Sequence, residues 1–451
     1  MGNMSMNNDK VDELLNVKLS KLKDNGQVLK KNVISVVEAL TKLNIEQCKD
    51  KYLCLSCIYG AFLGDSIGSC CEFSSPTSEN HKKIFTDGHL FKPGEVTDDS
   101  ELAISAAFGY IDSITNDHSR IQDYLYYYFG IWRYSGPKDI GHATNNALID
   151  FDGEDISTIK FDPTKVNTVN ENSLANGALM RISTAIVYFY YFNSSRIKTI
   201  INKFFSEDKI VELSDDMCQL YNDIFKELSL NVQITHPNFE NVISCSVFTL
   251  MVYVGMVTKD AKKVYNVFDI ISKSTSFANK HPQSLILIAK SVQQKYLQII
   301  EEIKSNKIKS VYKRMGYYIH GFKLSVYFLY KYPDMGENKD IDLYYKIMCD
   351  VCDYGGDTDT NCAIVGTMIG ALIGYKNFRT DLFNKFIKYI PSKRSQFNSA
   401  FIYLYVNFLE EKILKIDNNQ IQNNKNKKNL KYNYTAYEMI KTFLNKNMVI
   451  K

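Results

Sequence analysis

Apolar residues recur at intervals of three and four along most of the chain, and this spacing limits the chain to a helical fold. None of the runs alternates strictly between apolar and polar residues, and the 8 prolines are few for hairpin turns. We therefore expect an all-α protein, a single large orthogonal helical bundle. The helices are expected over 51–68, 99–114, 121–134, 177–194, 240–257, 283–303, 312–331, 342–353 and 360–375.

The same pattern divides the chain into three parts. Residues 1–50 are lysine-rich with helical spacing, which predicts a helical N-terminal extension. The strongest periodicity covers 51–376, interrupted by 135–176 and roughly 203–235, which we expect to be irregular. Residues 377–451 predict C-terminal helices around an Asn/Lys-rich low-complexity loop at 417–433.

Two of the expected helices carry a glycine at every fourth position. Such spacing leaves a bare ridge along each helix, where another helix backbone can approach closely. If the two ridges face each other, the crossing brings Asp65 and Glu72 near Asp357 and Asp359. The glycines are Gly60, Gly64 and Gly68 in the first helix and Gly366, Gly370 and Gly374 in the second.

Charge and cysteine content exclude several classes of protein. The 54 basic and 50 acidic residues give a net charge of +4, too small an excess to indicate nucleic-acid or membrane binding. The 10 cysteines lack zinc-ligand spacing and are expected to be reduced thiols. The N-terminus has no apolar core of a signal peptide, and the apolar runs 244–257 and 362–375 are shorter than the roughly 18–20 residues of a membrane span. We expect a monomer in the cytoplasm, with the nucleus as the alternative location, and no secretion.

Two helix starts are rich in aspartate, Thr97-Asp98-Asp99 and Asp357-Thr358-Asp359-Thr360. Each alone is typical of a helix cap, and Asp98 with Glu101 predicts a capping box. A cap, however, needs only one side-chain oxygen, so the surplus carboxylates indicate a cation. Oxygen ligands without His or Cys favour Mg²⁺ or Mn²⁺ over Zn²⁺. Four aspartates from two helix starts could hold two ions about 3.5–4 Å apart.

Five segments, in this order along the chain, resemble the motifs of the ADP-ribosylglycohydrolase family, also called the dinitrogenase-reductase-activating glycohydrolase family. The resemblance covers roughly 51–376, and it implies an all-α catalytic domain with a binuclear magnesium centre. The segments are GAFLGDSIGSCCEF (60–73), VTDDSE (96–101), SLANGALMRI (173–182), THPN (235–238) and GGDTDTNCAIVGTMIGALIG (355–374).

The resemblance also implies roles for individual residues. Glu72 matches a glutamate that lies beside the metals and gates the cleft or takes part in catalysis. Glu72, Asp98 and Asp359 are the catalytic candidates, and the resemblance does not choose the general base among them. The family's metal-binding positions fall on Thr97, Asp98, Asp99, Asp357, Asp359 and Thr360.

SLANGALMRI matches the family loop that holds the phosphates and distal ribose of ADP-ribose. Backbone amides near Gly177, if they open a helix, would suit a pyrophosphate. For Arg181 the alternative is a structural salt bridge, and for His236 a turn histidine before Pro237. The substrate-binding candidates are Ser173, Asn176, Gly177, Met180, Arg181 and His236.

The function implied by the resemblance is a magnesium-dependent hydrolase that cleaves the glycosidic bond between ADP-ribose and a modified protein side chain. Its substrate would be an ADP-ribosylated protein or another ADP-ribose conjugate. One alternative is an inactive, crystallin-like or ADP-ribose-binding member of the same fold. Another is a magnesium-dependent phosphohydrolase, which no phosphate-loop pattern supports. Arginine, serine, acetyl-ADP-ribose and poly-ADP-ribose linkages all stay open.

Overall fold

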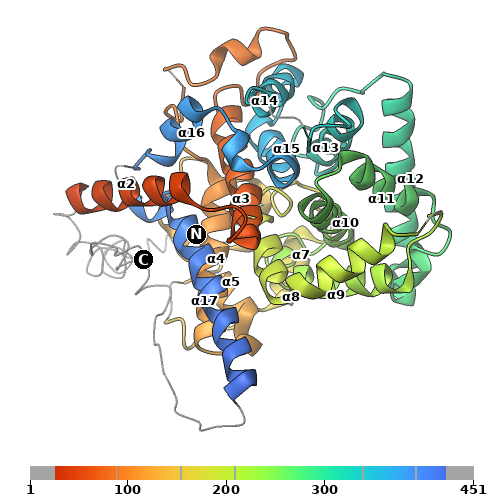
Figure 1. Ribbon diagram of the computed structural model, residues 1–451, viewed down its shortest axis with the longest axis horizontal. Helices are drawn as coiled ribbons and strands as arrows, with labels where there is room; N and C mark the ends of the chain where they lie inside the picture. The colour runs from red at the N-terminus through yellow and green to blue at the C-terminus, as the bar shows by residue number, and fades with distance from the viewer. Residues whose placement is uncertain are drawn as a thin grey trace, which may run out of the picture.

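In the computed structural model, helices account for the regular structure of the chain (Figure 1). The residues that the structure describes are 26–87, 89–152, 155–207, 210–337, 340–391 and 394–422. Over these ranges there is no β-strand, and two isolated bridges join loops, Ser74 to Gly356 and Ala175 to Tyr317. The prediction of an all-α protein is confirmed.

The α-helices follow one another through loops and 3-10 turns of different lengths. They are α2 (Gly26–Lys42), α3 (Lys49–Gly68), α4 (Asp98–Thr115), α5 (Ile121–Tyr134), α6 (His142–Ala147), α7 (Pro163–Asn170), α8 (Ser183–Phe204), α9 (Asp215–Val232), α10 (Phe239–Thr258), α11 (Ala261–Lys273), α12 (Ile286–Lys304), α13 (Ile319–Lys331), α14 (Leu343–Tyr354), α15 (Thr358–Ile373), α16 (Thr380–Ile387) and α17 (Phe401–Gln422).

Two stretches differ from the expected helices. Residues 177–182 and 312–318 form turns and loops instead of helix. Backbone hydrogen bonds connect the second of these stretches to the residues just before the first. The Asn176 amide donates to the Gly316 carbonyl (2.9 Å), and the Tyr318 amide donates to the Leu174 carbonyl (3.1 Å). The two loops thereby form one unit.

The prediction that 203–235 is irregular is wrong, because α9 fills most of it. Ser214 caps this helix by accepting a hydrogen bond from the Met217 amide. Its buried side chains recur at helical spacing, as at Leu220, Tyr221, Ile224 and Leu228. The charged residues between them, Asp223, Lys226 and Glu227, obscured the pattern.

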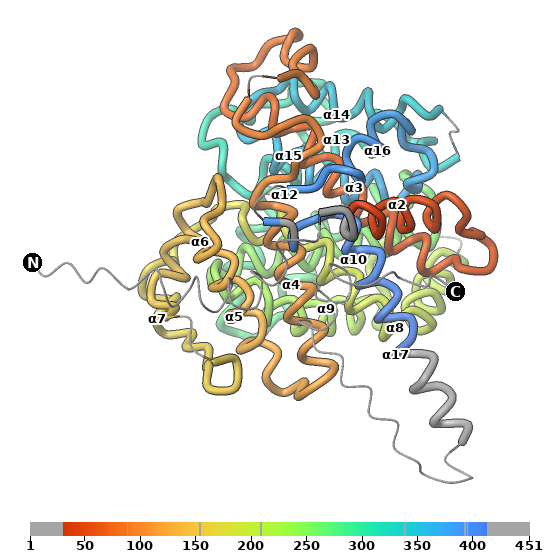
Figure 2. The backbone as a smooth tube through the Cα atoms, turned by 90° about the vertical axis from the view of Figure 1, so that its left-hand side faces the viewer, coloured from red at the N-terminus to blue at the C-terminus, as the bar shows by residue number. Residues whose placement is uncertain are grey.

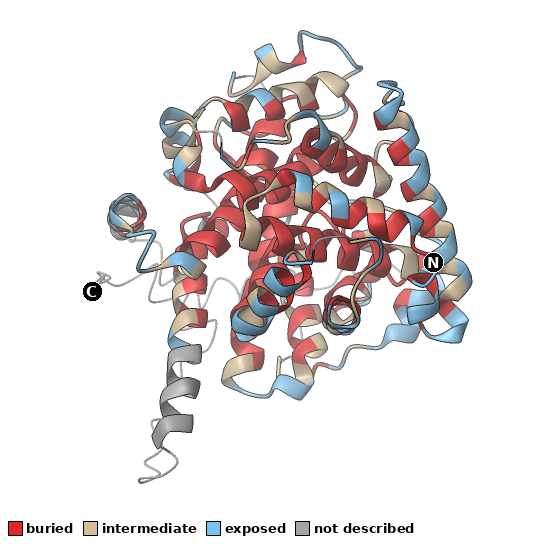
Figure 3. Cartoon of the chain, turned by 45° about the vertical axis from the view of Figure 1, so that its right-hand side comes forward, coloured by how far each residue is buried: buried red, intermediate tan, exposed pale blue. Residues whose placement is uncertain are grey.

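Helices α3 and α15 cross at the centre of the molecule, and every residue of α15 is buried. A Cβ atom added to Gly60 would lie 2.2 Å from the Gly366 carbonyl oxygen, and one added to Gly64 would lie 2.2 Å from the Cys362 carbonyl oxygen. The two bare ridges therefore face each other, as the sequence predicts. Figure 3 shows this buried centre surrounded by helices with mixed faces.

Helix α10 lies against α15 and is also a core helix. Among the described helices it is long and apolar enough to cross a membrane, with a mean hydropathy of 1.7, but 89% of that window is buried inside the protein. An all-round apolar helix in that position is expected in the centre of a large bundle.

The ends of the described chain pack on the outside of this centre, as Figure 2 shows for α2 and α17. The Tyr375 hydroxyl donates to the Leu40 carbonyl at the end of α2 (2.9 Å), and the Tyr405 hydroxyl of α17 donates to the Thr184 carbonyl of α8 (3.1 Å). Residues 417–422 of the expected low-complexity loop belong to α17. Residues 1–25 of the extension and 423–451 lie outside the described residues.

Candidate metal centre and substrate loop

The crossing of α3 and α15 places the two aspartate-rich helix starts against each other. Thr97 is the N-cap of α4, where its side chain accepts from the Asp99 amide. The Thr97 hydroxyl donates to Asp99 Oδ2 (3.0 Å), and the Thr360 hydroxyl of α15 approaches the same oxygen (3.4 Å). One buried carboxylate thus joins both helix starts.

The predicted capping box of Asp98 with Glu101 is not formed. Thr97 caps the helix, so neither carboxylate is needed for that purpose. Glu101 instead accepts from the Trp132 indole (2.8 Å) and pairs with Arg394 (2.8 Å). Asp98 is therefore left for the site.

Asp65, on the last turns of α3, fixes the position of the α4 start. Its carboxylate accepts from the Thr97 amide (3.1 Å), from the Ser100 amide (3.2 Å) and from the Ser100 hydroxyl. Burial raises its pKa to about 6, against the lowering effect of these hydrogen bonds. Asp65 was predicted to lie near the site, and the structure shows that it is the support for α4.

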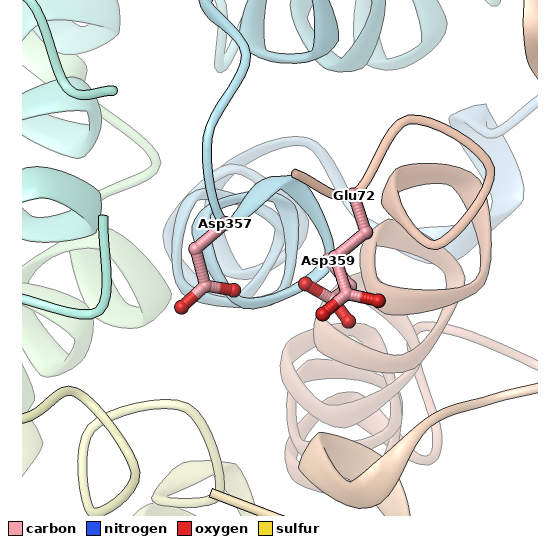
Figure 4. A group of neighbouring side chains, drawn as sticks. All are labelled: Glu72, Asp357 and Asp359. Atoms are coloured by element: carbon pink, nitrogen blue, oxygen red, sulfur yellow. The ribbon is translucent and has the colours of Figure 1, made fainter. Parts of the chain in front are cut away.

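Glu72, Asp357 and Asp359 form the cluster that Figure 4 shows, with their carboxylates pointing to the same side. Each residue offers one oxygen such that the three oxygens lie within 4.8 Å of one another. Asp359 is buried, and the other two are half-buried. The expectation that the helix crossing brings Glu72 near Asp357 and Asp359 is confirmed.

The carboxylates of the site disfavour one another's ionised forms. Burial, followed by the charges of Asp357 and its neighbours, raises the pKa of Glu72 to about 9. Burial also raises the pKa values of Asp98, Asp99 and Asp359 well above their ordinary range, and neighbouring carboxylates add to the effect. So many buried acidic groups are stable as anions only with a counter-charge.

The donor set fits a divalent cation. Asp99 Oδ1 is buried and has no hydrogen-bond partner among the described residues, so one lone pair of the site is unused. All the converging atoms are carboxylate and hydroxyl oxygens, the ligands that Mg²⁺ and Mn²⁺ prefer. The residues with the positions and chemistry to hold such ions are Thr97, Asp98, Asp99, Asp357, Asp359 and Thr360.

Two residues of the expected substrate loop reach this centre. The Asn176 side-chain amide donates to Asp357 Oδ2 (2.7 Å), which orients that carboxylate. The Thr360 hydroxyl lies 3.7 Å from the Met180 sulfur. The loop that the sequence assigns to ADP-ribose therefore borders the acidic cluster.

Comparison with known proteins identifies the family. A family model described as ADP-ribosylglycohydrolase matches residues 48–394, well over half of the chain. The chain belongs to the ADP-ribosylglycohydrolase family. A protein of Acanthamoeba polyphaga mimivirus, provisionally named as an ADP-ribosyl glycohydrolase, is 26% identical over 331 residues, which cover 70% of this chain and 85% of the relative.

A solved structure is also similar to this ADP-ribosylglycohydrolase family member. It is described as an ADP-ribosylglycohydrolase-related protein complex, and the two share 13% sequence identity. The match covers 80% of this chain and 97% of that chain, with a TM-score of 0.48.

The remaining loop residues of this family member lie farther back. The Ser173 carbonyl accepts from the Asn241 side-chain amide (3.0 Å), which ties the loop to α10. Gly177 is buried in a turn, and α8 begins only at Ser183. The expectation that Gly177 opens a helix is therefore wrong, although the glycine is needed for packing.

Arg181 and His236 support the loop from beneath. Arg181 is fully buried, donates to the carbonyls of Gly177 (2.5 Å) and Asn231 (3.2 Å), and lies over the Phe129 ring at 4.8 Å. His236 is fully buried against Gly177, where an added Cβ would lie 2.8 Å from its Cε1 atom. Burial lowers the pKa of His236 to about 3 and that of Arg181 to about 10. The structure thus gives both side chains a packing role, and their contact with substrate stays a prediction.

Asp139 is an acidic residue whose effect on the site the sequence argument missed. Its charge adds to burial in raising the pKa values of Glu72 and of Asp98. It lies in the loop between α5 and α6, outside the five segments that resemble the family's motifs, so the sequence offered no signal for it.

Proposed function

We propose that this chain is a magnesium-dependent hydrolase that cleaves the glycosidic bond between ADP-ribose and a modified protein side chain. Membership of the ADP-ribosylglycohydrolase family supports hydrolysis of ADP-ribosyl bonds in general. The observation that carries the finer proposal is the meeting of Glu72 with the two aspartate-rich helix starts in one buried cluster of oxygen ligands. We further propose two magnesium ions, with manganese as a substitute.

In this proposal Thr97, Asp98, Asp99, Asp357, Asp359 and Thr360 hold the ions. Bound Mg²⁺ supplies the counter-charge of the site and Lewis-acid polarisation of oxygen atoms beside it. Asn176 keeps the Asp357 carboxylate in one orientation through its 2.7 Å hydrogen bond. Asp65 holds the α4 start in place from behind.

Proton transfer at the scissile bond is assigned to a carboxyl group of the cluster. The reaction passes through an oxocarbenium-like transition state. The leaving group must receive a proton, and the water that attacks the anomeric carbon must lose one. Glu72 is half-buried at the edge of the cluster, where a substrate can reach it. We propose Glu72 for one of these transfers, with Asp98 and Asp359 as the other candidates.

The substrate is proposed to be an ADP-ribosylated protein or an ADP-ribose conjugate, bound along 173–182. We also propose a monomer in a reducing compartment, cytoplasmic or nuclear, with no nucleic-acid or membrane partner. The 10 cysteines, all free, support this location.

The test is release of free ADP-ribose from arginine- and serine-modified proteins, with Mg²⁺ or with a chelator. We expect release only with the metal, and the modified side chain that responds identifies the linkage. Asp359→Asn is expected to lower the rate of release by more than the roughly 10–100-fold that is typical when a residue supporting a metal ligand is changed. The same change at Asp334, exposed and paired with Lys262, is the control and should leave the rate unchanged.

Thermal unfolding with and without Mg²⁺ separates the alternatives. A protein that is stabilised by Mg²⁺ and binds ADP-ribose, yet releases nothing from either substrate, would be the binding member of the fold. Release that persists undiminished in chelator would reject the metal-dependent mechanism.

A further inference from the structure

A cavity of about 360 Å³ lies between α4, α8 and α9, away from the acidic cluster. Figure 1 labels these three helices. The metal centre is at the start of α4, whereas the cavity touches the end of the same helix at Ile114. Sixteen residues of helix separate Asp98 from Ile114, a distance of ~24 Å. The cavity is lined by Ile114, His118, Tyr188, Phe189, Phe192, Asn193 and Glu227.

Glu227 gives this cavity an unusual electrostatic character. Its Oε1 atom is buried and has no hydrogen-bond partner, and the carboxylate forms no ion pair within the described part of the chain. Burial alone raises its pKa to about 7. The Glu227 side chain as a whole is half-buried, so it is this one oxygen that lacks both water and a donor. A buried carboxylate oxygen without a donor or a cation is costly, and in native proteins it usually has a partner.

Aromatic rings form most of the remaining wall, and several of them pack against one another or against neighbouring rings. Tyr188 stacks on Tyr110, with ring centroids 4.2 Å apart, and Phe192 packs edge-on against Tyr188 at 5.3 Å. The Tyr188 hydroxyl lies 3.2 Å from His118 Nδ1. Ring faces next to a carboxylate are the arrangement that attracts organic cations.

The C-terminal end of α4 also favours a cation in this cavity. The last carbonyls of a helix carry a partial negative charge, and α4 ends at Thr115, directly after the lining residue Ile114. The volume is at the lower end of the roughly 300–1,000 Å³ of small-molecule sites, so the ligand is small.

We propose that this cavity binds a small organic monocation, an alkylammonium or guanidinium compound, whose charge pairs with Glu227 and whose carbon atoms pack against Tyr188, Phe189 and Phe192. The site is separate from the acidic cluster and independent of the proposed hydrolase activity.

The proposal is tested by calorimetric titration of the full-length protein with three probes. Choline is a methylated monocation, butylguanidinium is a monocation with hydrogen-bond donors, and the tert-butyl isostere of choline is uncharged. We expect at least one cation to bind about tenfold or more tightly than the uncharged isostere, as charge-assisted contacts predict. Stronger binding of butylguanidinium would identify hydrogen bonding to Glu227 as dominant, and stronger binding of choline would identify the aromatic wall.

Two variants locate the binding. Glu227→Gln keeps the shape of the side chain and removes the charge, and it should weaken the cation about tenfold or more without affecting the isostere. Phe192→Ala should lower the affinity for choline about threefold, because one aromatic ring of the wall is lost. Glu207→Gln, the same change at an exposed carboxylate, and Asp359→Asn in the acidic cluster should bind the probes as the wild type does.

Equal affinity for cation and isostere would overturn the proposal, as would unchanged cation binding in Glu227→Gln. Failure of every cation to bind at millimolar concentration would overturn it as well. Loss of hydrolase activity in Asp359→Asn with cation binding retained would show that the two sites are separate.

Discussion

Asp99 in the acidic cluster and Glu227 in the cavity are both carboxylates with a buried oxygen that has no hydrogen-bond partner among the described residues. Their different surroundings explain why the two sites suit different ligands. In the acidic cluster, Asp99 Oδ2 accepts hydrogen bonds from the hydroxyl groups of Thr97 and Thr360, which belong to two helix starts. Further carboxylates surround it. Such a concentration of hard anions suits a divalent ion. Glu227, in contrast, stands among aromatic rings with no second acidic ligand from the cavity wall, which suits a single organic charge.

Replacing Glu227 should change how stability depends on pH. Its pKa is about 7 in the folded protein and 4.5 in the reference state, so between these values the folded state binds more protons than the unfolded chain. The free energy of unfolding therefore falls as pH rises through this window. In Glu227→Gln this contribution disappears, and we expect a gain on the order of 1–3 kcal/mol above pH ~7.

Urea denaturation of both proteins between pH ~5 and ~8 measures this difference. The other titratable groups near Glu227 in the described part of the chain include Tyr110, Tyr188, Tyr253 and His118, and all four are retained in the variant. Glu207→Gln, at an exposed position, should leave the pH profile as it is. Parallel profiles for wild type and Glu227→Gln would mean that Glu227 is solvated.

At the scale of helices, the close crossing of α3 and α15 is what assembles the acidic cluster. We expect Gly64→Ala to lower the free energy of unfolding by about 3 kcal/mol or more, the upper end for an overpacked core. The added Cβ would lie 2.2 Å from the Cys362 carbonyl oxygen, which cannot move without shifting α15. ADP-ribose release should fall with it, because Asp357 and Asp359 stand at the start of α15.

Gly141→Ala is the matched control for this helix crossing. A Cβ at Gly141 meets no atom within 4 Å, and its backbone φ of -62° suits any residue. Its stability should stay within about 0.5 kcal/mol of wild type by chemical denaturation. If both alanine variants were equally stable, the close approach of α3 and α15 would not be a determinant of the fold.

Helix positions and the α3–α15 crossing could be predicted because both depend on local spacing, apolar in one case and glycine in the other. The approach of Glu72 to Asp357 and Asp359 followed from that crossing. Contacts between distant segments could not be predicted in the same way. Glu101 was assigned to a helix cap from its spacing alone, whereas in the fold its carboxylate accepts from Trp132 and pairs with Arg394.

Side-chain direction was the other limit. Arg181 follows the substrate-loop motif in sequence, but its guanidinium turns inward to backbone carbonyls, a choice set by tertiary contacts. Asp139, whose charge raises the pKa of Glu72, lies in a loop with no regular pattern. For α9, polar residues between the buried positions hid the helical period.

At the scale of the whole molecule, the chain after α15 completes the core around the site. Residues of α17 such as Phe401, Ile402 and Tyr405 are buried in the same hydrophobic core as α3 and α4. Arg394, just before this helix, reaches back to the start of α4. The C-terminal segment therefore supports the helix that carries Asp98 and Asp99.

Arg394→Gln tests that long-range support. Glu101 is buried, its pKa is raised to about 7, and Arg394 at 2.8 Å is its ion-pair partner. Removing one partner of a buried ion pair leaves an uncompensated charge. We therefore expect the free energy of unfolding, measured by urea denaturation, to fall by about 3–5 kcal/mol. Arg196→Gln, which breaks the more exposed pair with Asp223, should cost less than about 1 kcal/mol.

Adding Glu101→Gln to Arg394→Gln should recover part of the lost stability, because the unpaired carboxylate is then removed together with its partner. The recovery is the evidence that the two residues act on each other across the molecule, and a double-mutant cycle measures it. Purely additive losses would assign the effect of Arg394 to its packing on Phe397, where its guanidinium lies 4.8 Å from the ring. In that case the C-terminal segment would stabilise α4 through apolar burial alone.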